Sequence, residues 1–302
     1  MCKKTFFSIG RMNVEVQYPY SIDGRLFGYP NISYWQEAYV KVVILSFDVV
    51  YTKMPLYTHY IDGNFSGLIE DKYVTLFKKY GLVIVDDMEK KRVYVGIREK
   101  LWAEKSFYLI RSEINKHLLR FAFGLGTPLH AACMINDYRE GILIVGNQGS
   151  GKSTFARYLL NSGFKLVNDD MILYDIQNNK VSGFKEGLYL RPEMLENLTD
   201  AELKKVQDIA HGRKLFIEAE EKEVIGGIPV KYTILIDRDF CQSTKKLIDY
   251  NSAYNLLINA HKNWVVNKEE KDKLNEAFSS LIKNTNCFYT NLQNMEQLVI
   301  FL

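Results

Sequence analysis

The amino-acid sequence predicts an α+β fold, in which a β-rich N-terminal region is followed by an α/β core. Aromatic and β-branched residues in partial alternation fill much of residues 1–100, as is typical of strands. Residues 106–123 change to helical spacing, and the segments beyond them alternate between the two patterns. The 302 residues are 47% hydrophobic, which allows a sizeable core. We therefore expect two domains, residues 1–100 and residues 101–302.

The strands of the N-terminal region are predicted from their aromatic and β-branched content. They are expected at residues 5–10, 12–18, 39–50, 82–85 and 92–97. A charged turn at residues 86–91 joins the last two strands and predicts a hairpin. This region has no chemical signature, and we expect its sheet to cover or orient the rest of the chain.

A helix is predicted at residues 106–123, before the break Gly-Leu-Gly-Thr-Pro at residues 124–128. Its apolar face consists of Phe107, Ile110, Ile114, Leu118 and Phe121. Beyond this helix, strands are expected at residues 142–145, 164–167, 171–174, 231–237 and 287–290. Further helices are expected at residues 152–162, from 199 onward, 244–261, 268–282 and 294–302. Gly163 fits the C′ position after the helix expected at residues 152–162.

Composition and charge exclude several classes of protein. The net charge is +3 with Lys and Arg dispersed along the chain, so no dedicated nucleic-acid surface is expected. The four cysteines are far apart and suggest no metal site. No apolar run approaches the length of a membrane span, and the N-terminus lacks the pattern of a secretion signal. We therefore expect a soluble, cytoplasmic protein without nucleic-acid or membrane partners, and leave open a homo-oligomer.

A glycine-rich loop is the most informative feature of the chain. Residues 146–153 read GNQGSGKS, which matches the phosphate-binding pattern G-x-x-x-x-G-K-[ST] between an apolar strand and a helix. Backbone N–H groups of such a loop and the helix N-terminus favour phosphate, while the lysine reaches the β- and γ-phosphates. The expected nucleotide-binding residues are Gly146, Asn147, Gln148, Gly149, Ser150, Gly151, Lys152, Ser153 and Thr154. The sequence therefore predicts binding of a nucleoside triphosphate, with Ser153 on Mg²⁺.

Two consecutive carboxylates narrow the chemistry. Asp169 and Asp170 follow the next apolar strand, and ligands bind outside the carboxyl ends of strands in open α/β sheets. One carboxylate can hold Mg²⁺, and the other can accept a proton from an attacking hydroxyl. His130 precedes the loop and could orient that base if it lies near Asp169, although a lone histidine is more often structural.

Phosphoryl transfer also requires cations that neutralise the developing charge. Arg191 is one candidate, and Arg213 and Lys214 are others. Each is equally consistent with an ordinary surface cation.

Together these residues resemble the HPr kinase/phosphorylase family. The shared string consists of Leu129-His130, the strand 141–145, the loop 146–153, Gly163 and the segment 166–170, which reads LVNDD. The chain is most similar to the smaller HPr-kinase-like proteins of ribosomal peptide biosynthesis, including lasso-peptide precursor kinases. The resemblance is sharp over residues 127–176, weak over residues 177–302 and one of layout before them.

The resemblance implies transfer of a phosphoryl group from ATP to a Ser or Thr hydroxyl of a peptide or small protein. It implies that Lys152 and Ser153 hold the triphosphate and Mg²⁺, and that Asp169 is the general base with His130 beside it. Asp170 would help the metal. Arg191 would match an arginine of the family's second signature.

Two departures from the family keep alternatives open. Thr154 and Tyr189 stand where the family carries glutamates, and the latter glutamate serves the metal. One alternative is an ATP-binding regulatory module that transfers no phosphate. Another is a kinase for a small hydroxylated metabolite.

Overall fold

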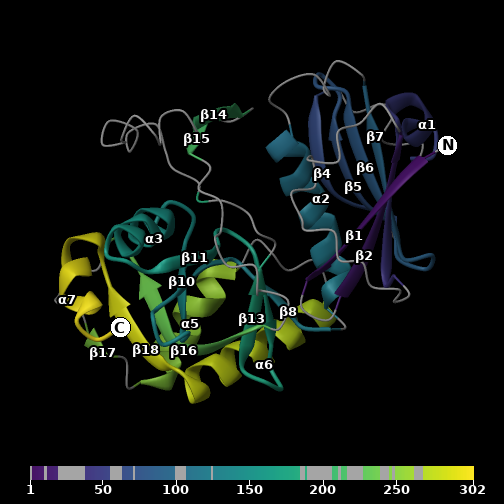
Figure 1. Cartoon of the computed structure of the whole chain (residues 1–302). Coiled ribbons are helices and arrows are strands. Elements are labelled where there is room, and N and C mark those ends of the chain that lie inside the picture. The colour runs from purple at the N-terminus through teal and green to yellow at the C-terminus, as the bar shows by residue number, and fades with distance from the viewer. Residues whose placement is uncertain are drawn as a thin grey trace. The chain divides into compact units, whose positions relative to one another are not determined.

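The computed structural model describes residues 2–9, 12–19, 38–54, 63–70, 72–98, 107–123, 125–183, 188, 206–209, 212–215, 227–238, 245–246, 249–261 and 268–302. It contains helices and two large sheets (Figure 1). The chain divides into two compact units, one of Met1–Ala122 with Asp208–Gly212, the other of Phe123–Gln207 with Arg213–Leu302. This division falls later than the boundary predicted near residue 100, because the long helix α2 (Phe107–Ala122) groups with the first sheet.

The first unit is a seven-stranded sheet with the order β1-β2-β3-β7-β6-β5-β4. Its elements are β1 (Cys2–Ile9), β2 (Met12–Pro19), β3 (Val40–Ser46), α1 (Phe47–Tyr51), β4 (Asn64–Ile69), β5 (Lys72–Phe77), β6 (Leu82–Asp87), β7 (Arg92–Ile97) and α2. Strands β4 to β7 form an antiparallel meander, whereas β3 runs parallel to both β2 and β7. The predicted hairpin at residues 82–97 is confirmed, and β4 and β5 were not foreseen.

One predicted strand of this unit is shorter than expected. Residues 39–50 read as a single strand, but the strand ends at Ser46 and α1 follows. Phe47 and Val50, three residues apart, are buried against β5 and β6 side chains such as Val74 and Val83. Residues three apart share one face of a helix but lie on opposite faces of a strand, so a helix buries Phe47 and Val50 on the same side.

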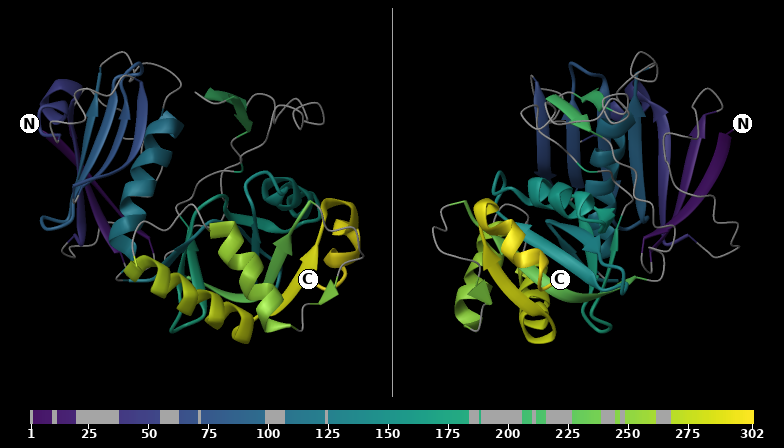
Figure 2. Two further views of the ribbon diagram at one scale, coloured as in Figure 1. Left: turned by 180° about the vertical axis from the view of Figure 1, so that it is seen from behind. Right: turned by 60° about the vertical axis from the view of Figure 1, so that its left-hand side comes forward.

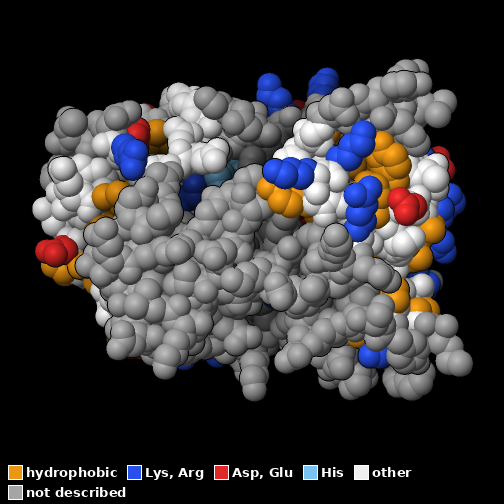
Figure 3. All heavy atoms as spheres, turned by 90° about the horizontal axis from the view of Figure 1, so that it is seen from above, with side chains coloured by type: hydrophobic (Ala, Val, Ile, Leu, Met, Phe, Trp, Pro, Cys, Tyr) orange, Lys and Arg blue, Asp and Glu red, His pale blue; other side chains and the backbone are white. Residues whose placement is uncertain are grey.

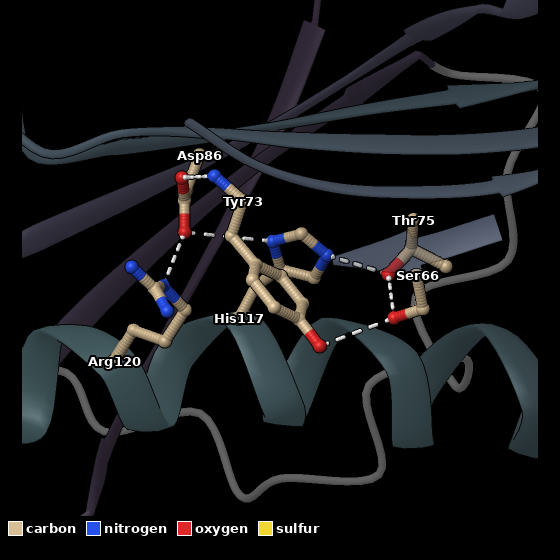
Figure 4. A network of polar contacts seen from close by, with 6 residues as sticks. All are labelled: Ser66, Tyr73, Thr75, Asp86, His117 and Arg120. Atoms are coloured by element: carbon tan, nitrogen blue, oxygen red, sulfur yellow. Dashed lines mark hydrogen bonds and ion pairs between the residues drawn. The ribbon is translucent and has the colours of Figure 1, made fainter. Parts of the chain in front are cut away.

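A buried carboxylate ties α2 to the sheet of the first unit. Asp86 on β6 is fully buried, accepts a hydrogen bond from the Tyr73 backbone N–H at 2.6 Å, and pairs with Arg120 Nε at 2.9 Å (Figure 4). The Arg120 guanidinium also lies 4.8 Å from the centre of the Tyr73 ring. The negative charge is therefore matched where water cannot solvate it.

A histidine of α2 extends this network. His117 is fully buried, and its Nε2 lies 3.0 Å from Thr75 Oγ1, which in turn lies 3.2 Å from Ser66 Oγ (Figure 4). His117 Nδ1 lies 3.8 Å from Asp86 Oδ2, which is beyond hydrogen-bond distance. Burial lowers the pKa of His117, while the neighbouring Asp86 opposes that shift. The imidazole therefore favours its neutral form.

Basic side chains of the first unit lie over aromatic rings. Lys53 Nζ is 4.9 Å from the centre of the Tyr94 ring, and Lys91 Nζ is 4.2 Å from that of Tyr39. Figure 3 shows lysine and arginine side chains beside hydrophobic ones on this unit, at its right-hand side. In such contacts the aliphatic part of the lysine packs along the surface while its ammonium group stays in water, as on an ordinary solvated surface.

The second unit contains a nine-stranded sheet and helices on both of its faces (Figure 2). The strands of this unit are β8 (Thr127–Leu129), β9 (Ala131–Ile135), β10 (Gly141–Gly146), β11 (Lys165–Asn168), β12 (Ile172–Asp175), β13 (Lys180–Gly183), β16 (Ile228–Ile236), β17 (Lys245–Lys246) and β18 (Asn286–Thr290). Its helices are α3 (Lys152–Asn161), α5 (Tyr250–His261), α6 (Lys268–Asn284), α7 (Met295–Val299) and the 3₁₀ turn η6 (Leu292–Asn294). A separate pair, β14 (Val206–Ile209) and β15 (Gly212–Leu215), forms its own two-stranded sheet.

Strand β10 shows why this sheet carries helices on both faces. Leu143 and Val145 belong to one core cluster with α5 and α6. Ile142 and Ile144 belong to the other, with α3 and α7. Successive side chains point to opposite faces, so a fully apolar run is what a strand covered on both sides requires.

Strand directions bring several chain segments to one edge of the sheet. β10, β16 and β18 are parallel. β9 is antiparallel to β10, and β11 is antiparallel to β9, so β11 runs in the direction of β10. The carboxyl ends of β10, β11, β16 and β18 therefore lie at the same edge, together with the start of β9. Seven of the nine strands follow one another in the order β11-β9-β10-β16-β13-β12-β8, while β18 pairs with β16 and β17 pairs with β18.

Helix α3 ends as its sequence predicts. Gly163 has φ +94°, and its N–H donates to Leu160 O at 3.1 Å, while Phe164 N–H donates to Leu159 O at 3.0 Å. These two bonds make a Schellman motif with Gly163 at C′. The chain then turns directly into β11.

Candidate functional site: a phosphate-binding loop with two aspartates

The glycine-rich loop connects β10 to α3, as predicted. A Cβ on Gly146 would lie 2.5 Å from Ile236 O of the neighbouring strand and 2.4 Å from Ser150 Oγ, so only glycine fits there. Gly151 has φ +108°, and a Cβ at that position would collide with the Leu292 side chain at 2.6 Å. The loop is therefore shaped by close packing against β16 and η6, which leaves the N-terminus of α3 for an anion.

Lys152 lies across the loop that precedes it. Its side chain is 7% exposed, and Nζ donates to Gly146 O at 2.9 Å and Asn147 O at 3.2 Å. Burial lowers the pKa of Lys152, whereas the charges of Asp170 and Asp169 oppose that shift. A triphosphate would offer this ammonium stronger acceptors than two carbonyl groups do.

Ser153 and Asp169 face each other at the start of α3. Ser153 Oγ donates to Asp169 Oδ2 at 2.9 Å, and Asp169 is 1% exposed at the end of β11. A hydroxyl and a carboxylate are hard oxygen donors, which suits Mg²⁺ held by one or two protein groups and substrate phosphates. The Ser153 hydroxyl and the Asp169 carboxylate therefore fit Mg²⁺. The described residues contain no group of three or more His, Cys, Asp and Glu that could hold a metal ion.

Asp170 pairs with His130, not with the phosphate-loop serine. His130 lies between β8 and β9, and its Nε2 is 2.9 Å from Asp170 Oδ1. The Asp170 side chain is 40% exposed and that of His130 is 13% exposed. The family resemblance implies His130 beside Asp169, whereas His130 forms its ion pair with Asp170, and Asp169 accepts the Ser153 hydroxyl.

The backbone at Asp170 explains this difference in partners. Asp170 has φ 76°, and Met171 N–H donates to Asp169 O at 3.0 Å, which together describe a γ-turn centred on Asp170. The buried Asn168 amide holds this turn by donating to Asp169 O at 3.1 Å and to Met171 O. A left-handed aspartate is a strained conformation, and such strain persists where neighbouring bonds enforce it. The turn separates two consecutive carboxylates and gives them different partners.

Asp237 was not recognised from the sequence as a residue of this edge. It directly follows β16, which pairs in parallel with β10 so that Ile236 lies opposite Gly146. Its Oδ2 accepts a hydrogen bond from Tyr289 OH at 2.8 Å. The signal was present, because Ile234-Leu235-Ile236 is an apolar run that ends in an aspartate.

The remaining predicted residues fall into two groups. Gln148, Gly149 and Thr154 lie in the loop and the first turn of α3, beside the residues described above. Arg191 and Tyr189 lie outside the described residues, as do the side chains of Arg213 and Lys214. The structure therefore brings together Lys152, Ser153, Asp169, Asp170 and His130.

A phosphate-binding loop between a buried strand and a helix, with a serine on a carboxylate at the edge of the sheet, defines the class of P-loop nucleotide-binding proteins. No protein-family model matches the chain. The chain is similar to dephospho-CoA kinase of Fusobacterium nucleatum subsp. nucleatum, at 29% identity over 184 residues that cover 52% of this chain and 93% of the relative. This distant similarity to a P-loop kinase supports ATP-dependent phosphotransfer in general. Among the described residues, no helix is long and apolar enough to cross a membrane.

Proposed function

We propose that the chain is an ATP-dependent kinase that transfers the γ-phosphate to a Ser or Thr hydroxyl of a peptide or small protein. The observation that carries the proposal is the His130–Asp170 pair, at 2.9 Å and partly exposed, at the edge of the sheet that presents the phosphate loop. A carboxylate held by an imidazole beside bound phosphate is suited to accept a proton from a hydroxyl. A module that only binds ATP has no need of such a pair.

The loop residues bind and orient the triphosphate in this proposal. The N-terminus of α3 and the loop N–H groups face the phosphates, and Lys152 moves from Gly146 O and Asn147 O onto the β- and γ-phosphates. Ser153 and Asp169 would hold Mg²⁺, which when bound neutralises charge on the β- and γ-phosphate oxygens. Both residues would therefore act chiefly on nucleotide binding.

The general base in this proposal is Asp170, whereas the family resemblance implies Asp169. Asp169 Oδ2 already accepts the Ser153 hydroxyl, and the side chain is almost fully buried. Asp170 is open enough to meet an acceptor hydroxyl, and His130 fixes the direction of its carboxylate. The proton would pass from the attacking hydroxyl to a carboxylate oxygen of Asp170 as the hydroxyl oxygen bonds to the γ-phosphorus. The bond between the γ-phosphorus and the β–γ bridging oxygen would break in the same step, and ADP would leave.

A small hydroxylated metabolite is the second candidate for the acceptor. The similarity to dephospho-CoA kinase favours it, because that protein is named for a small-molecule substrate. The peptide acceptor is supported by the resemblance of residues 127–176 to HPr-kinase-like proteins. The chemistry at Asp170 and His130 is the same in both cases, so only the acceptor distinguishes them.

The test is a phosphate-transfer assay with two panels of acceptors. The full chain is incubated with [γ-³²P]ATP and Mg²⁺, either with Ser- and Thr-containing peptides encoded beside its gene or with small hydroxylated compounds that include dephospho-CoA. We expect mass spectrometry to find one added phosphate on a peptide, lost in Lys152→Ala and in Asp170→Asn. Phosphate found only on a small compound would support a metabolite kinase instead of a peptide kinase. ATP binding without transfer to any acceptor would support a regulatory module that transfers no phosphate.

A further inference from the structure

A second histidine bonds to the backbone of His130, whose ring pairs with the Asp170 carboxylate. His261 is the last residue of α5 and is 1% exposed. Its Nε2 accepts a hydrogen bond from His130 N–H at 2.8 Å. Its Nδ1 lies 2.8 Å from Leu257 O, one turn earlier in the same helix. A carbonyl can only accept, so Nδ1 carries the proton and Nε2 carries the lone pair.

The surroundings of His261 keep this tautomer in place. Burial lowers the pKa of His261 to about 3, and the nearby charges of His130 and Lys152 contribute to this shift. The hydrogen bond with the Leu257 carbonyl opposes it. A protonated ring would have donors at both nitrogens and could not accept from His130 N–H. The ring also packs against Phe278 of α6, with centroids 5.0 Å apart, and edge-on to the His130 ring at 6.4 Å. The acceptor is therefore fixed in both chemistry and position.

His130 occupies the single position between two short strands. Leu129 ends β8 and Ala131 begins β9, and these strands pair with β12 and with β10 and β11. An additional bond at the His130 N–H sets how the backbone passes from one strand to the next. The direction of its Cα–Cβ bond decides whether Nε2 reaches Asp170.

We propose that His261 is a positioning residue, which holds the backbone of His130 so that its ring meets the Asp170 carboxylate. This inference rests on the proposed function of the Asp170–His130 pair. His261 touches neither phosphate nor acceptor in this role and acts only through His130. A displacement of about 1 Å at a reacting group can cost about a hundredfold in rate.

The experiment compares three variants that differ in one respect each. His261→Phe keeps an aromatic ring of similar size and removes the acceptor. His261→Gln keeps an acceptor that can reach the His130 N–H. His117→Phe makes the same change at another buried histidine, in the first unit, and controls for loss of a buried imidazole.

Two readouts separate a positioning role from a merely structural one. Amide hydrogen exchange of His130, measured by NMR on the folded protein, reports the bond itself. The kcat and the KM for ATP, on the acceptor found above, report its consequence. We expect His261→Phe to lose protection at the His130 amide and about tenfold to a hundredfold in kcat with an unchanged KM for ATP. His261→Gln should retain most of both, and His117→Phe should retain both.

Three outcomes would overturn the inference. The first two are full protection of the His130 amide in His261→Phe and an unchanged kcat in that variant. The third is that His261→Phe lowers kcat by the same factor in a His130→Ala background, because a residue that acts through His130 has no effect once that ring is gone. Absence of transfer by the wild-type protein would instead contradict the proposed function, and hydrogen exchange would still decide whether His261 holds the His130 backbone.

Discussion

Each unit of this chain places a carboxylate near an imidazole, and the two pairs differ in their access to solvent. In the first unit, Asp86 and His117 are fully buried, and Arg120 matches the carboxylate charge. In the second unit, Asp170 and His130 are 40% and 13% exposed. The same residue types thus anchor a helix in one unit and line the edge of a phosphate-binding sheet in the other.

This comparison shows that residue type alone does not identify a site. His117 and Asp86 lie 3.8 Å apart without a hydrogen bond, whereas His130 and Asp170 are at 2.9 Å. A substrate cannot reach a fully buried group, but it can reach one at the carboxyl edge of a sheet. Exposure and position beside the loop, more than composition, distinguish the candidate site from the structural network.

The largest effect is expected at Asp170. Asp170→Asn removes the proton acceptor and keeps the shape of the side chain, so we expect phosphate transfer to fall by about a hundredfold to ten-thousandfold. ATP affinity should be nearly unchanged, as measured by isothermal titration with Mg²⁺. Asp169→Asn is the matched control, and it should weaken Mg²⁺-dependent ATP binding instead. Equal losses of transfer and binding in both variants would contradict the separation of roles.

In the first unit, the largest effect is expected at Arg120. Arg120→Leu leaves the Asp86 charge buried and without its cation, which costs about 3–5 kcal/mol of folding free energy. Urea unfolding followed by circular dichroism measures this loss, and Arg120→Lys should recover part of it. We expect kcat of the folded protein to stay at the wild-type value. A strong fall in kcat would show that the two networks are functionally linked.

Acid should destabilise the protein through its buried histidines. The pKa of His261 is about 3 in the folded chain against an ordinary value of 6.5, so only the unfolded chain takes up that proton between these pH values. Stability is therefore lost as the pH falls through this window, by about 2 kcal/mol between pH 7 and pH 5 for His261. Urea unfolding at both pH values should show a flatter profile for His261→Phe. The same slope in variant and wild type would contradict a neutral buried His261.

Much of this arrangement could be predicted from periodicity and one motif. The strand before the loop, the helix from Lys152, its end at Gly163 and the strand before Asp169 all have strong local signals. Local signals fail where tertiary contacts decide, as at residues 47–51, which form α1 because Phe47 and Val50 are buried together.

The partners of the two aspartates could not be predicted because they depend on one backbone angle. Asp169 and Asp170 are identical in type and adjacent, and only the γ-turn held by Asn168 turns one toward Ser153 and the other toward His130. His261 lies 131 residues from His130 along the chain, so no spacing rule connects them. Asp237, in contrast, was readable as the end of a buried strand.

The smallest effect is expected at Ser66, and it tests whether the first unit hides a reactive site. Ser66, His117 and Asp86 are the residue types of a hydrolase triad, but Thr75 lies between the serine and the histidine. Ser66 Oγ is 3.2 Å from Thr75 Oγ1, and Thr75 Oγ1 is 3.0 Å from His117 Nε2. The imidazole contacts threonine and not the serine, so Ser66 has no general base within reach. We expect no labelling by a fluorophosphonate probe. Ser66→Ala should cost at most about 1 kcal/mol of folding free energy, because Ser66 is exposed and water can replace its hydroxyl group. Labelling that disappears in Ser66→Ala would make the buried network of the first unit a second active site and end the contrast between the two units.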